Sequence, residues 1–172
     1  MALNLAQQTS SQRYERLQSQ TREIAALEDS IRQLAARLPP PPPPSDRVAE
    51  KQGFRIVLDT CTRSGSVVEC ELTVTNTEAD RVLRLASSSN NYGRSSAYTG
   101  TGTIHSATGT TVGTRTQRGY SGDTLIQGEP VNASVRFRDV SREAALLTTV
   151  DLWFWSGGSS FNVRYENVSI EG

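Results

Sequence analysis

Histidine, cysteine and net charge are all scarce in this sequence of 172 residues. It contains one histidine and two cysteines, and 18 lysines and arginines balance 18 aspartates and glutamates. A chain without net charge has no long-range field to steer it onto nucleic acid or an anionic membrane. So few histidines and cysteines supply little for a metal centre and no histidine pair for acid–base catalysis. We therefore expect no nucleic-acid partner, no metal and no cofactor, and the composition argues against an enzyme.

Long apolar runs are also missing. No segment approaches the roughly 18 consecutive apolar residues of a membrane-spanning helix. The first residues, MALNLAQQTSSQRYERL, lack the basic start and the apolar core of about 7–15 residues that mark a secretory signal. These absences predict no membrane association and a protein made in the cytosol, which stays there or leaves the cell without the standard secretion route.

Residues 1–38 contain a heptad pattern of apolar side chains on a segment without glycine or proline. Position a is occupied by Leu17, Ile24, Ile31 and Leu38, and position d by Leu27 and Leu34. The stripe is narrow, which favours a parallel coiled coil over a single amphipathic helix packed on its own domain. Ile at a with Leu at d suits a dimer, but by analogy with other stalked β-domains we expect a trimer.

Six consecutive prolines follow at positions 39–44. Such a run adopts polyproline II, which rises about 3.1 Å per residue, or roughly 19 Å in all. We interpret residues 39–52 as a stiff spacer between the helix and a β-domain. The alternative is a ligand for an SH3-like or profilin-like groove.

Residues 53–172 read as an all-β domain. Apolar and polar residues alternate in segments that begin at Phe54, Cys70, Ala133, Val150 and Phe161. This period of two indicates half-buried antiparallel strands. Weaker candidates lie near residues 82–86, 102–107 and 124–127, and residues 142–147 form a short helix or a turn. The number and spacing of the strands predict an antiparallel two-sheet sandwich.

The two cysteines flank a predicted hairpin. A two-residue type II′ turn at Gly65-Ser66 would place Cys61 opposite Cys70 in a non-hydrogen-bonded pair, with Cα atoms about 4.5 Å apart. That separation allows a disulfide; the alternative is two buried free thiols. Cytosolic proteins seldom keep disulfides. A disulfide without a secretion signal therefore points to a virion protein, which is made in a host cytosol and works outside the cell after lysis.

Aromatic side chains mark a candidate contact surface. Residues 87–122 are rich in Ser, Thr, Gly and Asn and contain Tyr92, Tyr98 and Tyr120, a composition typical of adaptable binding loops. The alternative is a long solvated excursion with weak strands. Trp153 and Trp155 lie two apart, on the strand face opposite the core residues. They either pack beneath a covering loop or anchor a contact with a protein or glycan.

His105 is the one residue able to serve as the base of a serine or cysteine triad. Its surroundings, Gly102-Thr103-Ile104-His105-Ser106, contain no nucleophile motif. We therefore interpret it as an ordinary strand or loop histidine and expect no catalytic residues.

The segment from Cys61 to Cys70, with the following LTVTN run at residues 72–76, resembles a bacterial immunoglobulin-like β-sandwich. In that family a Cys-hairpin-Cys leads into such a strand, and the last strand is similar to FNVRYENV at residues 161–168. The resemblance covers residues 53–172 and implies a non-catalytic immunoglobulin-like fold. The order of helical stalk, proline spacer and β-head also resembles phage decoration, cement and fibre proteins.

These features together predict a non-enzymatic structural accessory protein of a tailed-phage particle. It would be a capsid decoration, cement or short fibre component that oligomerises, or docks on other virion proteins, through its helix and presents its β-head. The alternative is a binding module of the bacterial envelope or cytoplasm that recognises a protein or a glycan.

Overall fold

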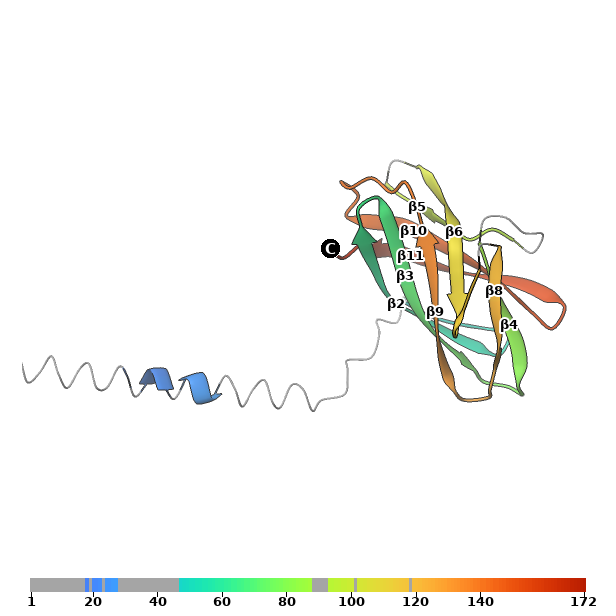
Figure 1. The fold of residues 1–172 in the computed structure, drawn as a ribbon, viewed down its shortest axis with the longest axis horizontal. Helices are drawn as coiled ribbons and strands as arrows, with labels where there is room; N and C mark the ends of the chain where they lie inside the picture. The colour runs from blue at the N-terminus through green and yellow to red at the C-terminus, as the bar shows by residue number, and fades with distance from the viewer. Residues whose placement is uncertain are drawn as a thin grey trace, which may run out of the picture. The chain divides into compact units, whose positions relative to one another are not determined.

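The computed structural model describes residues 18, 20–22, 24–27, 47–87, 93–100, 102–117 and 119–172. The chain divides into two compact units, Met1–Pro42 and Pro43–Gly172. The described residues of the first unit are helical (Figure 1). Leu17, Ile31, Leu34, Leu38 and the prolines at 39–44 lie outside the described residues, so the coiled coil and the spacer stay predictions.

The second unit is antiparallel β-structure, and its alternating sequence segments form strands as predicted. The strands are β1 (Val48–Lys51), β2 (Phe54–Ser64), β3 (Val67–Asn76), β4 (Arg81–Ala86), β5 (Ser96–Tyr98), β6 (Ile104–Val112), β7 (Arg115–Gln117), β8 (Tyr120–Leu125), β9 (Pro130–Phe137), β10 (Leu146–Ser156) and β11 (Ser159–Ser169). Strand β1 lies within residues 39–52, the range predicted as a spacer, so the sheet begins before residue 53. Residues 142–143 form a turn, and β10 begins at Leu146.

The strands follow the order β1-β2-β3-β9-β6-β5-β10-β4-β8, with β11 on β10 and β7 on β6. The order has two halves: β1, β2, β3 and β9 lie on one side of β6, and β5, β10, β4 and β8 lie on the other. Strand β6 pairs with both halves (Figure 1). Its first residues, from Ile104, pair with β5, and its later residues, to Val112, pair with β9. The register shifts between Ala107 and Gly109, which re-aims the strand at the point where it changes partner. The result is an antiparallel all-β domain compatible with a β-sandwich.

The β2–β3 hairpin has the predicted register. Ser64 pairs with Val67 across the turn, and Cys61 pairs with Cys70. Gly65 has a φ of 66°, the positive value that the first central position of a type II′ turn requires. A bulge at Asp59 follows, because Leu58 pairs with Leu72 whereas Thr60 pairs with Glu71. The extra residue returns Cys61 to the core face three positions after Leu58.

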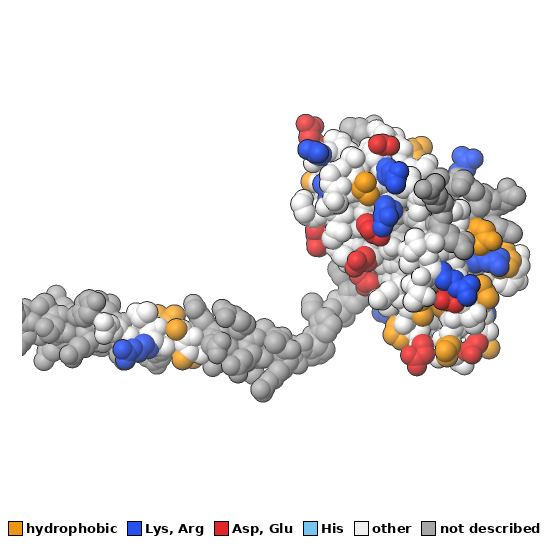
Figure 2. All heavy atoms as spheres, in the orientation of Figure 1, with side chains coloured by type: hydrophobic (Ala, Val, Ile, Leu, Met, Phe, Trp, Pro, Cys, Tyr) orange, Lys and Arg blue, Asp and Glu red, His pale blue; other side chains and the backbone are white. Residues whose placement is uncertain are grey.

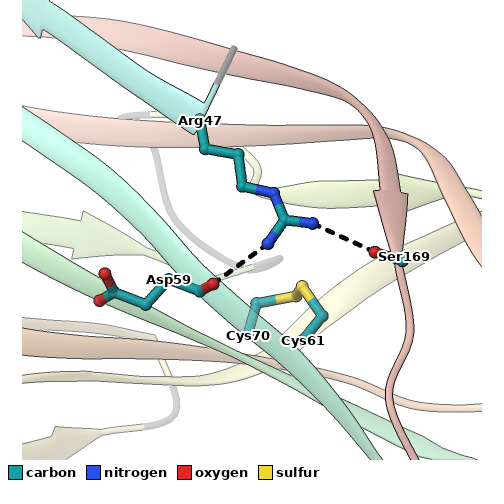
Figure 3. The surroundings of a disulfide bond; sticks show 5 residues. All are labelled: Arg47, Asp59, Cys61, Cys70 and Ser169. Atoms are coloured by element: carbon teal, nitrogen blue, oxygen red, sulfur yellow. Dashed lines mark hydrogen bonds between the residues drawn. A yellow bond between two sulfur atoms is a disulfide. The ribbon is translucent and has the colours of Figure 1, made fainter. Parts of the chain in front are cut away.

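The cysteines form the predicted disulfide, with their Cα atoms 4.0 Å apart and both side chains fully buried (Figure 3). Arg47 lies beside it and donates to the carbonyl of Asp59 and to Ser169 Oγ, both at 3.1 Å. The C-terminus returns to the same strand. The Glu171 N–H donates to the Cys61 carbonyl, and the Arg63 N–H donates to the Glu171 carbonyl, each at 2.8 Å. The disulfide therefore lies where β2, β3 and the end of the chain meet.

The core lies between the inward faces of the two halves. Phe161 stacks between Phe54 and Phe154, with ring centroids 6.0 and 5.5 Å away. Around these rings lie buried aliphatic side chains, among them Ile56, Leu58, Leu72, Val74, Leu83, Leu85, Leu125, Val135, Leu147, Val150, Leu152 and Val163. This apolar burial, at roughly 25 cal/mol per Å², stabilises the head together with the disulfide.

Candidate binding face

The outer face of β10, β4 and β8 brings together two of the five aromatic residues predicted as a contact surface. Trp155 lies on β10 and Tyr120 on β8, and both are half-buried. Trp153 is on the same face of β10. Tyr98 lies on β5 opposite Thr149, at the other end of β10 from Trp155. Tyr92 lies outside the described residues.

Arg84 on β4 joins Trp155 to Tyr120. It pairs with Trp155 on one side and with Gly122 on the other. Its guanidinium carbon lies 4.6 Å from the centroid of the Trp155 ring and 5.3 Å from that of Tyr120. Both distances are within the range of a cation–π contact, so the two rings hold the charged group in place. Arg84 was not among the residues predicted from the sequence to form a contact surface, although its outward position in the alternation of β4 is visible there.

Gly122 makes room for this arrangement. A Cβ atom at Gly122 would lie 2.5 Å from Arg84 Cγ and 2.8 Å from the Leu83 carbonyl oxygen. Only a residue without a side chain lets the Arg84 stem lie across β8. The absence of a side chain at Gly122 therefore leaves room for the Arg84 side chain as well as for the backbone of the neighbouring strand.

A shallow hollow of about 260 Å³ opens beside Arg84. It is lined by Val82, Arg84, Arg115, Tyr120, Gly122, Asp123 and Thr124, which come from β4, β7 and β8. In Figure 2, hydrophobic and Lys or Arg side chains lie side by side over the region where Figure 1 shows β4 and β8. Within the described residues, neither Arg84 nor Arg115 forms an ion pair with a carboxylate. The hollow thus contains two cationic groups together with one carboxylate, that of Asp123.

Trp153 has different surroundings from Trp155. Gly93, at a φ of 130°, approaches so closely that a Cβ atom there would lie 2.4 Å from the Trp153 ring. The backbone N–H of Trp153 donates to Ser95 Oγ at 3.0 Å. The segment Gly93–Ser95 therefore covers Trp153, as in the covering-loop alternative, whereas Trp155 carries Arg84.

His105 lies on β6 and is 6% exposed. Its Nε2 is 3.4 Å from Thr99 Oγ1. The part of the chain that the structure describes contains no group of three or more His, Cys, Asp or Glu residues placed to share a metal ion. No helix among the described residues is long and apolar enough to span a membrane.

Three buried polar residues, Asn76, Asp151 and Tyr165, join segments of the fold by hydrogen bonds, and the sequence pattern predicted none of these bonds. Asn76 donates to the carbonyls of Ala79 and Leu125 at 3.0 and 3.1 Å. Asp151 accepts from Asn162 at 2.9 Å and from Arg164 at 3.2 Å. These partners are distant in sequence or depend on the local turn, so no periodicity marks them.

Tyr165 is the third. Its hydroxyl donates to the Ile56 carbonyl at 3.0 Å. Burial raises the pKa of Tyr165 well above its ordinary value, and the carboxylate of Asp59 raises it further. The phenol therefore stays protonated and acts as a structural donor.

Comparison with known proteins adds little to this description. No protein-family model matches the chain, and no curated protein matches it. A solved structure described as "AvmM Catalyzes Macrocyclization in Alchivemycin A Biosynthesis" is similar over 74% of this chain and 97% of its own, with 13% sequence identity and a TM-score of 0.22. At this TM-score the likeness supports no statement about fold or function. What the described residues define is an antiparallel all-β domain with a buried disulfide.

Proposed function

We propose that this chain is a non-enzymatic structural accessory protein of a tailed-phage particle, a capsid decoration, cement or short fibre component. Residues 1–38 join copies of the chain, and the head, an immunoglobulin-like sandwich, contacts a neighbouring surface. The proposal that the head is immunoglobulin-like rests on the resemblance of the Cys61-hairpin-Cys70 segment and the LTVTN run at residues 72–76 to that family.

The observation that carries this proposal is how the head distributes its polar and aromatic groups. Within the head, the buried polar side chains of Asn76 and Tyr165 form hydrogen bonds that join strands. Its fixed aromatic and cationic groups, Arg84 with Trp155 and Tyr120, lie on an outer face. Trp, Tyr and Arg are the residues that most often dominate the energy of protein contacts. This distribution suits a domain that works by surface fit.

The described helical residues support assembly through the N-terminal segment. Ile24 at position a and Leu27 at position d are 57% and 58% exposed in the single chain. A coiled coil of several copies of the chain would bury both, together with the predicted seam at Leu17, Ile31, Leu34 and Leu38. We propose three copies, the number expected by analogy with stalked β-domains.

The disulfide supports work in oxidising surroundings, as on a particle outside the cell. The same bond is compatible with a bacterial envelope, and the Arg84 hollow favours a head that binds a ligand or partner. A binding module of the envelope is therefore the second candidate function. A cytoplasmic binding module is a further form of it, in surroundings where a disulfide seldom persists.

Fractionation of the source tests the proposal. Antibody against the head is used to follow the chain through purified phage particles, the cell envelope and the cytosol, with immunogold imaging of the particles. The proposal expects the chain in washed particles at a constant ratio to the major capsid protein. Chain confined to the envelope or the cytosol, and absent from washed particles, would overturn the particle assignment.

A further inference from the structure

We infer that the hollow beside Arg84 binds the acidic sugar of a surface glycan, a uronic or sialic acid residue. The inference rests on the proposed function, because it names the chemistry that the exposed face of the head would contact. Its three elements are a fixed guanidinium, a second arginine without an ion pair in the described residues, and a carboxylate beside them.

The fixed guanidinium is the first element. The Arg84 guanidinium carbon lies over the Trp155 ring, 4.6 Å from its centroid, and 5.3 Å from the Tyr120 centroid. The N–H donors of a guanidinium lie in its own plane and point outward from its edge. Because the rings already order the side chain, binding costs little conformational entropy there. Such a group is suited to donate two parallel hydrogen bonds to a carboxylate.

Arg115 on β7 supplies the second cation of the hollow. Its side chain is exposed, and within the described residues no carboxylate lies in ion-pair range of it. Two arginines that converge on one hollow favour an anionic ligand over a neutral one. The shared preference of both guanidinium groups is a planar carboxylate.

Asp123 narrows the ligand class. Its Oδ1 accepts the Thr124 N–H at 2.9 Å, and its Oδ2 is held close to the β6–β7 turn, where a Cβ on Gly113 would lie 2.9 Å away. A carboxylate accepts hydrogen bonds from hydroxyl groups and repels a second acidic group. An acidic peptide, with its repeated carboxylates, meets this repulsion. A sugar that carries one carboxylate among several hydroxyls can place the carboxylate on the arginines and a hydroxyl on Asp123.

The size and walls of the hollow agree with a single sugar ring. Its volume of about 260 Å³ is below the range of about 300–1,000 Å³ typical of pockets for drug-sized ligands. Val82 and Tyr120 provide an apolar wall for the C–H face of a ring. The hydroxyl group of Thr124 adds a neutral hydrogen-bonding group beside the charged ones.

Binding of the purified full chain to immobilised saccharides tests this inference. The acidic probes are a glycan that ends in a single galacturonate residue and sialyllactose, and the matched controls are the methyl ester of that galacturonate glycan, lactose and a hexaglutamate peptide. We expect binding to at least one acidic saccharide and at least tenfold weaker binding to its neutral counterpart and to hexaglutamate. Equal binding of hexaglutamate, or no binding of either acidic saccharide, would overturn the inference.

Variants locate the site. Arg84→Ala and Arg115→Ala should each weaken acidic-saccharide binding at least tenfold, and Arg84→Lys should weaken it because an ammonium lacks the planar two-donor edge. Arg142→Ala removes an exposed arginine from the turn before β10 and should leave binding unchanged. Arg115 is exposed, so its variant keeps the test valid if Arg84→Ala fails to fold. Wild-type affinity in both Arg115→Ala and Arg84→Lys would contradict the site.

The two proposals fail separately. If the protein is present in washed particles but binds no acidic saccharide, only the sugar site is overturned. If the protein binds an acidic saccharide through Arg84 and Arg115 but is absent from particles, only the particle assignment is overturned.

Discussion

The hydroxyl of Tyr165 on β11 donates a hydrogen bond to the carbonyl of Ile56 on β2, with 3.0 Å between the two oxygens. The bond connects two strands 109 positions apart in the chain, and both side chains are buried. Because the phenol is held neutral in this environment, the contact depends on pH in a defined direction.

Replacing Tyr165 with Phe should lower the free energy of unfolding by about 1–3 kcal/mol, because the Ile56 carbonyl loses its buried donor. An unfolded tyrosine titrates near pH 10, whereas burial raises the pKa of Tyr165 above that value. Above about pH 10 the unfolded state therefore releases its proton first, and stability falls as pH rises. Urea unfolding between pH 7 and 11 should show a shallower alkaline decline in Tyr165→Phe. Parallel declines in both proteins would contradict this role.

The Cys61–Cys70 bond should resist chemical attack in the folded protein, because both sulfurs are fully buried. Alkylation under native conditions, with and without reductant, should label neither cysteine until denaturant is added. The double variant Cys61→Ala/Cys70→Ala should fold with a free energy of unfolding lower by at most about 3 kcal/mol, since the closed loop is short. Rapid alkylation of both cysteines in the untreated native protein would show that the bond is absent.

Asn76 should tolerate no exchange of its amide for a carboxylate. Its Nδ2 group donates to two carbonyls, those of Ala79 and Leu125, and Asp has no hydrogen to replace it. Asn76→Asp should lower the free energy of unfolding by more than about 2 kcal/mol at pH 7. The matched control is Asn132→Asp, exposed on β9, with an expected change within about 0.5 kcal/mol. Equal effects of the two changes would refute a structural role for the Asn76 amide.

The β2–β3 hairpin shows what the sequence could predict. Gly65 and Ser66 determine a two-residue turn, and the register from Ser64–Val67 to Cys61–Cys70 follows by counting. The disulfide follows from that register. Every step is local, since turn chemistry and a period of two depend on neighbouring residues.

Local sequence patterns do not predict features that depend on distant partners. Strand β1 forms because Val48–Lys51 pairs with β2, although its own sequence shows no alternation. The bulge at Asp59 is marked only by the three-residue step from Leu58 to Cys61. The change of partner along β6 depends on how the two halves of the domain meet, which no short window contains.

The candidate site shows the same limit. Alternation predicted the outward face of Trp153 and Trp155, but their surroundings depend on other segments. Gly93 covers the first ring, and the Arg84 guanidinium lies over the second. Neither neighbour is close in sequence, so the pattern alone did not distinguish the covered tryptophan from the one beside the hollow.

We propose that residues 1–38 assemble three copies of the chain, and the mass of the full chain in solution tests this most directly. Sedimentation equilibrium should give three times the 18.8 kDa mass of one chain. Ile24→Ala/Leu27→Ala should shift the mass toward one chain without breaking the helix. The control Gln18→Ala, at an exposed position outside the a/d seam, should leave the mass unchanged. A wild-type mass of one chain at tens of micromolar would contradict the claim.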